Sequence, residues 1–74
     1  MDYNEHISSD PKVMLGKPVI KGTRITVELI LDLLSQGASI DEILVMYPHI
    51  TKEGILASIA YAHDVILNVE SIAA

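Results

Sequence analysis

From residue 26 onward, apolar side chains recur at the three- and four-residue spacing of amphipathic helices. The first predicted helix, residues 26–36, begins at the N-cap Thr26 and ends before Gly37. The second begins at Ser39, which is spaced to form a capping box with Glu42, and stops near residue 47 because Pro48 follows. Two helices separated by a short break are therefore predicted.

A third and longer helix is predicted to begin at the cap Thr51. Its apolar positions are Ile55, Ile59, Ala62 and Ile66, flanked by Leu56, Ala60 and Leu67. Residues 68–74 either fray or continue this helix. A short helix, a tight link and a longer helix form the layout of a helix-turn-helix unit, with the first helix as its support.

The first part of the chain predicts an extended arm with turns rather than a helix. Prolines and glycines interrupt it at Pro11, Gly16, Pro18 and Gly22. Short apolar pieces at 13–15 and 19–20 are predicted to be extended or β, and no helix holds this backbone rigid. The fold class is therefore mainly α, a single domain with an N-terminal extended arm with short β segments (1–25) and a helix-turn-helix helical part (26–74).

The balance of apolar residues favours association with another subunit. The chain has 74 residues, of which 50% are hydrophobic and none is Cys, so a small core must form without disulfides. We therefore expect a homodimer. Candidate dimer-interface residues are Tyr61, Ile66, Leu67, Val69 and Ile72, which give the third helix more apolar circumference than one core face requires. The alternative is that these residues close the same core.

The N-terminus predicts neither export nor membrane insertion. Its first residues, 1–5, are polar and acidic where a signal peptide needs a cationic region and an apolar stretch. No apolar run approaches the roughly 20 residues that span a bilayer. We expect a cytoplasmic protein that has no contact with a membrane.

Positive charge is concentrated in one short stretch of an otherwise acidic chain. The formal net charge is −5, yet Lys12, Lys17, Lys21 and Arg24 lie in a segment that contains no acid. This stretch indicates an arm that lies along a phosphate backbone or against an acidic partner. The alternative is a solvated turn whose cations pair with the protein's own carboxylates.

The third helix is a weak candidate for reading DNA bases. The side chains that we expect outside the core are Lys52, Glu53, Gly54, Ser58 and Tyr61. This helix has no Arg for guanine, and no Asn or Gln for adenine before residue 68. Lys52 and Ser58 join the four arm cations as candidate DNA- or partner-binding residues, but any binding of DNA is expected to depend on the arm.

The sequence does not predict an enzyme, a metal site or a cofactor. His63 and Asp64 are adjacent, and His49 lies in the link between helices, but the three His residues are too far apart for a local ligand motif. There is no Gly-rich phosphate loop, nucleophile elbow, acidic metal cluster or zinc spacing. We expect function through binding.

The run Gly-Lys-Pro-Val-Ile-Lys-Gly-Thr-Arg-Ile at 16–25, followed by Ser39 to Leu44, Tyr47-Pro48, Thr51 and residues 57–62, resembles the bacterial and archaeal family called domain of unknown function 433. The resemblance covers about residues 7–65. The sequence departs from the family pattern at Gly54, where an acid often strengthens the cap of the third helix. Glycine lowers helix propensity by about 1 kcal/mol relative to alanine, so the start of this helix is expected to be softer.

The resemblance implies a short N-terminal β segment before a homeodomain-like three-helix bundle, and it implies dimerisation. In many members it implies an antitoxin that binds a PIN-domain ribonuclease toxin and represses its own operon. Two hypotheses follow: a dimeric DNA-binding antitoxin or transcriptional autoregulator, and a protein–protein interaction module that binds no nucleic acid. The arm serves either one, because it can lie on operator DNA or across the metal-binding carboxylates of a nuclease.

Overall fold

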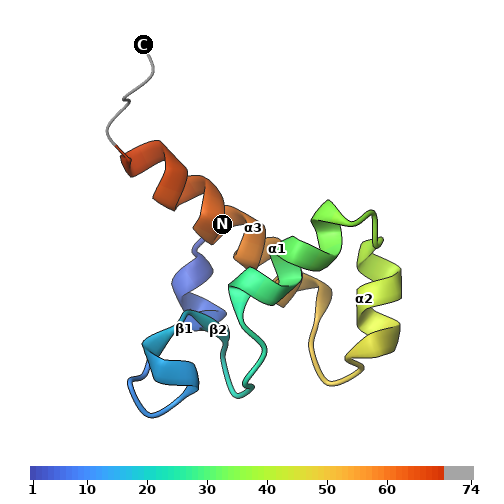
Figure 1. The fold of residues 1–74 in the computed structure, drawn as a ribbon, viewed down its shortest axis with the longest axis horizontal. Helices are drawn as coiled ribbons and strands as arrows, with labels where there is room; N and C mark the ends of the chain where they lie inside the picture. The colour runs from blue at the N-terminus through green and yellow to red at the C-terminus, as the bar shows by residue number, and fades with distance from the viewer. Residues whose placement is uncertain (70–74) are drawn as a thin grey trace.

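The computed structural model describes residues 1–69 of the chain. The elements in chain order are the 3-10 turn η1 (Tyr3–Glu5), strand β1 (Ile7–Ser8), the turn η2 (Met14–Gly16), strand β2 (Val19–Ile20), and helices α1 (Val27–Ser35), α2 (Ile40–Met46) and α3 (Lys52–Asn68). The fold is mainly α, with three helices and a short two-stranded sheet at the N-terminus, as the sequence predicts (Figure 1).

Side-chain caps start all three helices where the sequence predicts them. The Thr26 hydroxyl accepts a hydrogen bond from the Leu29 amide (3.0 Å), and the Thr51 hydroxyl accepts one from the Gly54 amide (3.1 Å). Helix α1 ends in a Schellman motif, in which the amide of Ala38 donates to the Leu33 carbonyl and Gly37 adopts a φ of +95°. These local hydrogen bonds fix the helix boundaries independently of tertiary packing.

The start of α2 is a complete capping box. The Glu42 amide donates to Ser39 Oγ (3.0 Å), and the Ser39 amide donates to Glu42 Oε1 (2.9 Å). Hydrogen bonding of the Glu42 carboxylate by Ser39, mainly through the Ser39 backbone amide and also through its side chain, lowers the pKa of Glu42 below its ordinary value. Ionised Glu42 therefore stabilises the folded state above its unfolded pKa, and this contribution is lost as the pH falls through the folded value.

This capping box predicts that the stability of the protein depends on pH through Glu42. Glu42→Gln keeps an acceptor for the Ser39 amide but does not titrate, so the wild type is expected to be more stable than the variant near neutral pH. The difference should shrink as the pH falls through the lowered pKa of Glu42, where the wild-type carboxyl becomes protonated. Urea unfolding of both proteins at pH 7 and pH 3 measures it, and a difference that is unchanged between the two would contradict this assignment.

The N-terminal arm is part of the hydrophobic core. Strands β1 and β2 pair antiparallel, with Ile7 opposite Ile20, and the sheet contacts α3. Ile7, Val19, Ile20 and Ile25 are all buried, and Figure 1 shows the N-terminal segment lying beside the helices. The prediction of short β segments is confirmed, but the expectation of an arm without rigid support is wrong. Its β-branched residues hold it against the bundle.

Helix α3 is central to the fold, because it contacts α1, α2, both strands and η1. The face it buries agrees only in part with the one the sequence predicts, because Ile55 belongs to both. The buried residues are Gly54, Ile55, Ala57 and Ser58. Ile59 is 39% exposed and Ile66 is 72% exposed, although both belong to the predicted apolar face. Small side chains allow a closer approach of neighbouring elements than large ones, so the core lies against the small-residue face.

Gly54 and Ser58 make this close approach possible. A Cβ atom on Gly54 would lie 3.3 Å from Cγ2 of Ile20, tighter than ordinary van der Waals contact. Ser58 is fully buried, and its hydroxyl donates to the Gly54 carbonyl at 2.9 Å, so it has no unsatisfied polar atom. The glycine that departs from the family pattern at the cap of α3 thus has a packing role against strand β2.

The N-terminus is attached to the middle of α3. The ring of Tyr3 packs edge-on against Tyr61, with 5.4 Å between centroids, and the Tyr3 hydroxyl donates to Asp64 Oδ2. This hydrogen bond is the main cause of the raised pKa of Tyr3. Tyr3 is therefore held to two residues of α3, each more than 50 positions away in sequence, by an aromatic contact with Tyr61 and a charge-assisted hydrogen bond to Asp64.

Within residues 1–69, none of the helices is long and apolar enough to cross a bilayer.

Candidate functional site

A compact loop between β1 and β2 carries the first two cations of the basic stretch. The Asp10 side chain accepts a hydrogen bond from the Lys12 amide (2.9 Å), and the Asp10 carbonyl accepts one from Val13 (2.8 Å). The Val13 carbonyl then accepts from Gly16, and the Met14 carbonyl accepts from Lys17, each at 3.1 Å. Consecutive hydrogen bonds therefore give this loop a defined shape.

The loop contains an unusual backbone turn. Met14, Leu15 and Gly16 have φ values of 48°, 59° and 84°, which lie in the left-handed region that favours glycine. The prediction of an extended or β piece at 13–15 is confirmed for Val13, which is extended and bridges to Asp10, and is wrong for Met14 and Leu15, which form the turn that Gly16 completes. The turn leaves the Leu15 side chain 92% exposed. No periodicity in the sequence marks Leu15 as a surface residue.

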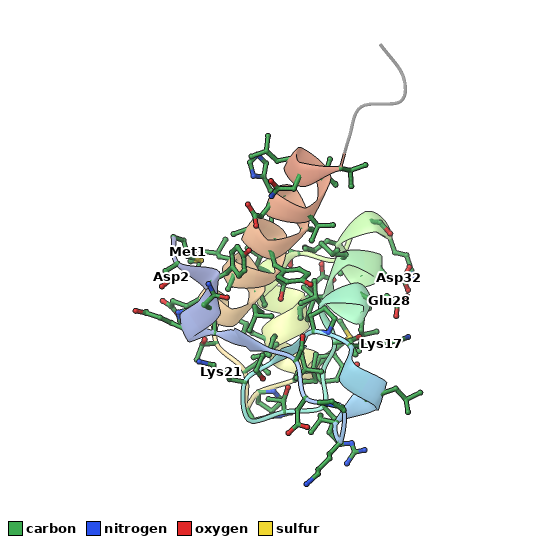
Figure 2. The ribbon with its side chains drawn as sticks, turned by 90° about the vertical axis from the view of Figure 1, so that its left-hand side faces the viewer. Met1, Asp2, Lys17, Lys21, Glu28 and Asp32 are labelled. Atoms are coloured by element: carbon green, nitrogen blue, oxygen red, sulfur yellow. The ribbon has the colours of Figure 1, made fainter. Side chains whose placement is uncertain are left out.

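Three of the predicted cations surround one hollow at this loop. Its volume is about 360 Å³, and it is lined by Pro11, Lys12, Met14, Leu15, Lys17 and Arg24. Arg24 also lines a neighbouring hollow that includes Asp10. Lys21 does not line either hollow, and Figure 2 shows Lys17 and Lys21 on opposite sides of the molecule in that view. We call Lys12, Lys17 and Arg24, with the hollow between them, the cationic end.

One of these cations pairs with a carboxylate of the same chain. Lys17 Nζ lies 2.9 Å from Glu28 Oε1, with both side chains largely exposed, and Figure 2 shows the two residues side by side. Such a surface pair contributes about 0–1 kcal/mol. The interpretation as a solvated turn therefore applies to Lys17. Lys12, Lys21 and Arg24 are exposed, and within residues 1–69 no carboxylate lies within 4.0 Å of their charged groups.

Only one of the two DNA- or partner-binding residues predicted on α3 is exposed. Lys52 is exposed at the first position of α3. Ser58 is wrong as a binding residue, because it is fully buried against the core. The exposed side chains on this part of α3 also include Glu53, Leu56 and Ile59. This surface is short of hydrogen-bond donors for base edges.

The predicted interface residues fall into two groups. Tyr61 is half-buried under Tyr3 and belongs to the edge of the core. Ile66, Leu67 and Val69 are 72%, 69% and 58% exposed. Ile72 lies outside the described residues. The core interpretation therefore holds for Tyr61, while an interface role for Ile66, Leu67 and Val69 stays a prediction.

An apolar groove adjoins the exposed residues of α3, and sequence reasoning did not find it. It has a volume of about 310 Å³ and is lined by Pro18, Val27, Glu28, Leu31, Tyr61, Ala62, Val65 and Ile66. Helices α1 and α3 supply most of this lining, as their crossing in Figure 1 allows. Only the packing of two segments distant in sequence creates it.

Comparisons with known proteins support the fold. A crystal structure at 2.00 Å of a DUF433 member protein from Anabaena variabilis ATCC 29413 is similar, with a TM-score of 0.77 and 31% sequence identity. The match covers 86% of this chain and 63% of that one, so this chain spans less than two thirds of that protein's length. No curated protein matches the chain. A family model described as protein of unknown function (DUF433) matches residues 7–62. This chain is therefore a member of the DUF433 family.

Proposed function

We propose that this protein is an antitoxin-type binding protein that acts as a homodimer in the cytoplasm and holds a PIN-type ribonuclease through its cationic end. It performs no catalysis in this role. The observation that carries the proposal is the gathering of Lys12, Lys17 and Arg24 around one hollow, in a chain whose net charge is −5. The chain's overall charge disfavours nonspecific attraction to acidic molecules, so a local cationic site favours one defined acidic partner.

A ribonuclease of this type suits the cationic end chemically. Its active site gathers carboxylates that bind metal ions, and cations placed against those carboxylates are electrostatically complementary to them. Arg24 can form a bidentate pair with a carboxylate, whereas Lys12 and Lys17 act as point charges. Lys17 already lies on a carboxylate of its own chain, so exchange of Glu28 for a partner carboxylate preserves its pairing.

The exposed residues of α3 support dimerisation. Apolar side chains are exposed at Ile66, which lines the groove between α1 and α3, and at Leu67 and Val69, which follow it in sequence. Clustered apolar surface of this kind is typical of a subunit interface. In the proposed dimer, this end of α3 packs on the second subunit, and the cationic end of each subunit stays available.

Co-expression with the product of the adjacent gene tests the proposal. We expect a stable complex at physiological salt in which the ribonuclease no longer cleaves single-stranded RNA. Sedimentation of the isolated protein is expected to give twice the monomer mass. An adjacent product that is no nuclease, or one that neither binds nor loses activity, would contradict the antitoxin role.

Operator DNA is a second candidate ligand. The observation in its favour is the placement of exposed Lys52 at the start of α3, in a helix-turn-helix arrangement with α2. If DNA lies along the cations, the affinity should fall steeply with salt, at about −0.9 in log K per log salt for each phosphate contact. Replacing Lys17, Lys21 and Arg24 with Ala should then make the slope of log K against log salt less negative by about 0.9 for each of the three that contacts a phosphate. Gel shifts on the protein's own promoter measure this slope. An unchanged slope would remove these residues from the DNA.

A further inference from the structure

The turn at residues 14–16 combines two unfavourable features in the isolated protein. Met14 and Leu15 carry side chains but adopt φ values of 48° and 59°, a region in which Cβ crowds the backbone. Leu15 also leaves 92% of its surface exposed to water. Asparagine or glycine would satisfy this backbone better and would expose no apolar surface. Leucine therefore contributes nothing to the stability of the fold at this position.

The loop holds the backbone of this leucine in place. Gly16 donates to the Val13 carbonyl, and Lys17 donates to the Met14 carbonyl, so both ends of the turn are hydrogen-bonded. A side chain on an ordered backbone loses less conformational freedom on binding than one on a flexible loop. Leu15 is thus preorganised for insertion into another surface.

The charges beside Leu15 indicate the chemistry of that surface. Lys12, Lys17 and Arg24 line the same hollow as Leu15 and Met14. An apolar centre within a polar, charged rim is the usual anatomy of a specific protein interface, in which a few central anchors dominate the binding energy. The complementary surface has an apolar socket rimmed by carboxylates.

Several observations favour a protein over DNA as the occupant. The exposed part of α3 presents Glu53, Leu56 and Ile59 beside Lys52, which is a poor surface for phosphates and bases. Lys21 lies apart from the hollow that Lys12, Lys17 and Arg24 line, so the cations of the arm do not form one continuous track for a phosphate backbone.

We propose that Leu15 is the apolar anchor of the cationic end and enters a carboxylate-rimmed socket on the protein partner. This inference rests on the proposed function, because it adds an anchor and a specificity determinant to the same site. Lys12 and Arg24 pair with the carboxylates at the rim, while Leu15 fills the centre.

Substitution of Leu15 tests the inference with the co-purified ribonuclease as the probe. Leu15→Asn suits the left-handed backbone and removes the apolar side chain, so the variant should remain folded, with a thermal midpoint at least equal to that of the wild type. Its affinity for the ribonuclease should fall by about 10- to 100-fold, the loss expected for exposing a buried leucine. Leu15→Met should retain most of the affinity. Val45→Asn removes an apolar side chain that is 81% exposed on α2, and it should have no effect.

The outcomes separate this inference from the proposed function. If the wild type binds the ribonuclease and Leu15→Asn binds equally well, the anchor is wrong while the antitoxin role stands. If the wild type does not bind, both are wrong. A Leu15→Asn variant that keeps the ribonuclease but loses operator DNA would make Leu15 a minor-groove wedge and overturn the proposal. If Leu15→Asn loses only self-association, as measured by sedimentation, the socket belongs to a second copy of this chain. That result would also overturn the proposal.

Discussion

Replacing Ile55 with Ala is expected to lower the free energy of unfolding by about 2–5 kcal/mol, the range for deleting a fully buried isoleucine. Ile55 has no exposed surface and lies on the face of α3 that meets the core. For a chain of 74 residues, the total stability is roughly 4–11 kcal/mol, so the variant should lose a large part of its free energy of unfolding. Urea unfolding followed by circular dichroism measures this change.

Ile66→Ala is the matched control on the same helix. Ile66 is 72% exposed, so the same substitution should change the stability of the monomer by no more than about 0.5 kcal/mol. If α3 forms the proposed dimer interface, the cost of Ile66→Ala should grow with protein concentration, while that of Ile55→Ala should not. Equal costs for both substitutions in dilute solution would contradict the burial pattern of α3.

Reversing the charge of the cationic end is expected to abolish its proposed function. In the variant Lys12→Glu with Arg24→Glu, two carboxylates would face the acidic partner, and close charge pairs at interfaces couple by about 1.5–7 kcal/mol. Affinity for the ribonuclease should fall by at least about 100-fold. Both side chains are exposed, so the fold should be unaffected. Calorimetric titration of the two purified proteins measures the loss, with ribonuclease activity as a second readout.

Lys21→Glu separates local complementarity from total charge. Lys21 is exposed but lies outside the hollow that Lys12, Lys17 and Arg24 line. Its reversal should lower the affinity only slightly, by a screened, long-range effect that disappears at high salt. A loss as large as that of the double variant would show that net charge, rather than the cationic end, governs binding.

The sequence predicts the local features of this fold well. The N-caps Thr26, Ser39 and Thr51, together with the glycine after α1, place the helix boundaries, because each depends on hydrogen bonds between residues within a few positions. The cationic stretch is likewise visible in the sequence. The sequence does not show that three of these cations surround one hollow while Lys21 lies elsewhere, because that arrangement depends on how the loop folds.

Apolar periodicity predicts the buried face of α3 only in part, since Ile55 lies in the core as its spacing suggests. Large apolar residues such as Ile59 and Ile66 suggest a core face by their spacing, yet the core meets Gly54 and Ser58. The choice is made by strand β2, whose Ile20 fits against the glycine. This contact joins residues 34 positions apart, and a pattern along one helix contains no information about it. The left-handed turn at Leu15 is hidden for a related reason, since periodicity does not report the sign of φ.

The attachment of Tyr3 to Tyr61 and Asp64 has a practical consequence for handling this protein. The first residues of the chain pack against α3 through Tyr3. Their removal by a protease would uncover the ring of Tyr61, which lines the apolar groove. A preparation that has lost its first residues should aggregate more readily and be less soluble than the intact chain, even though all three helices would still be present.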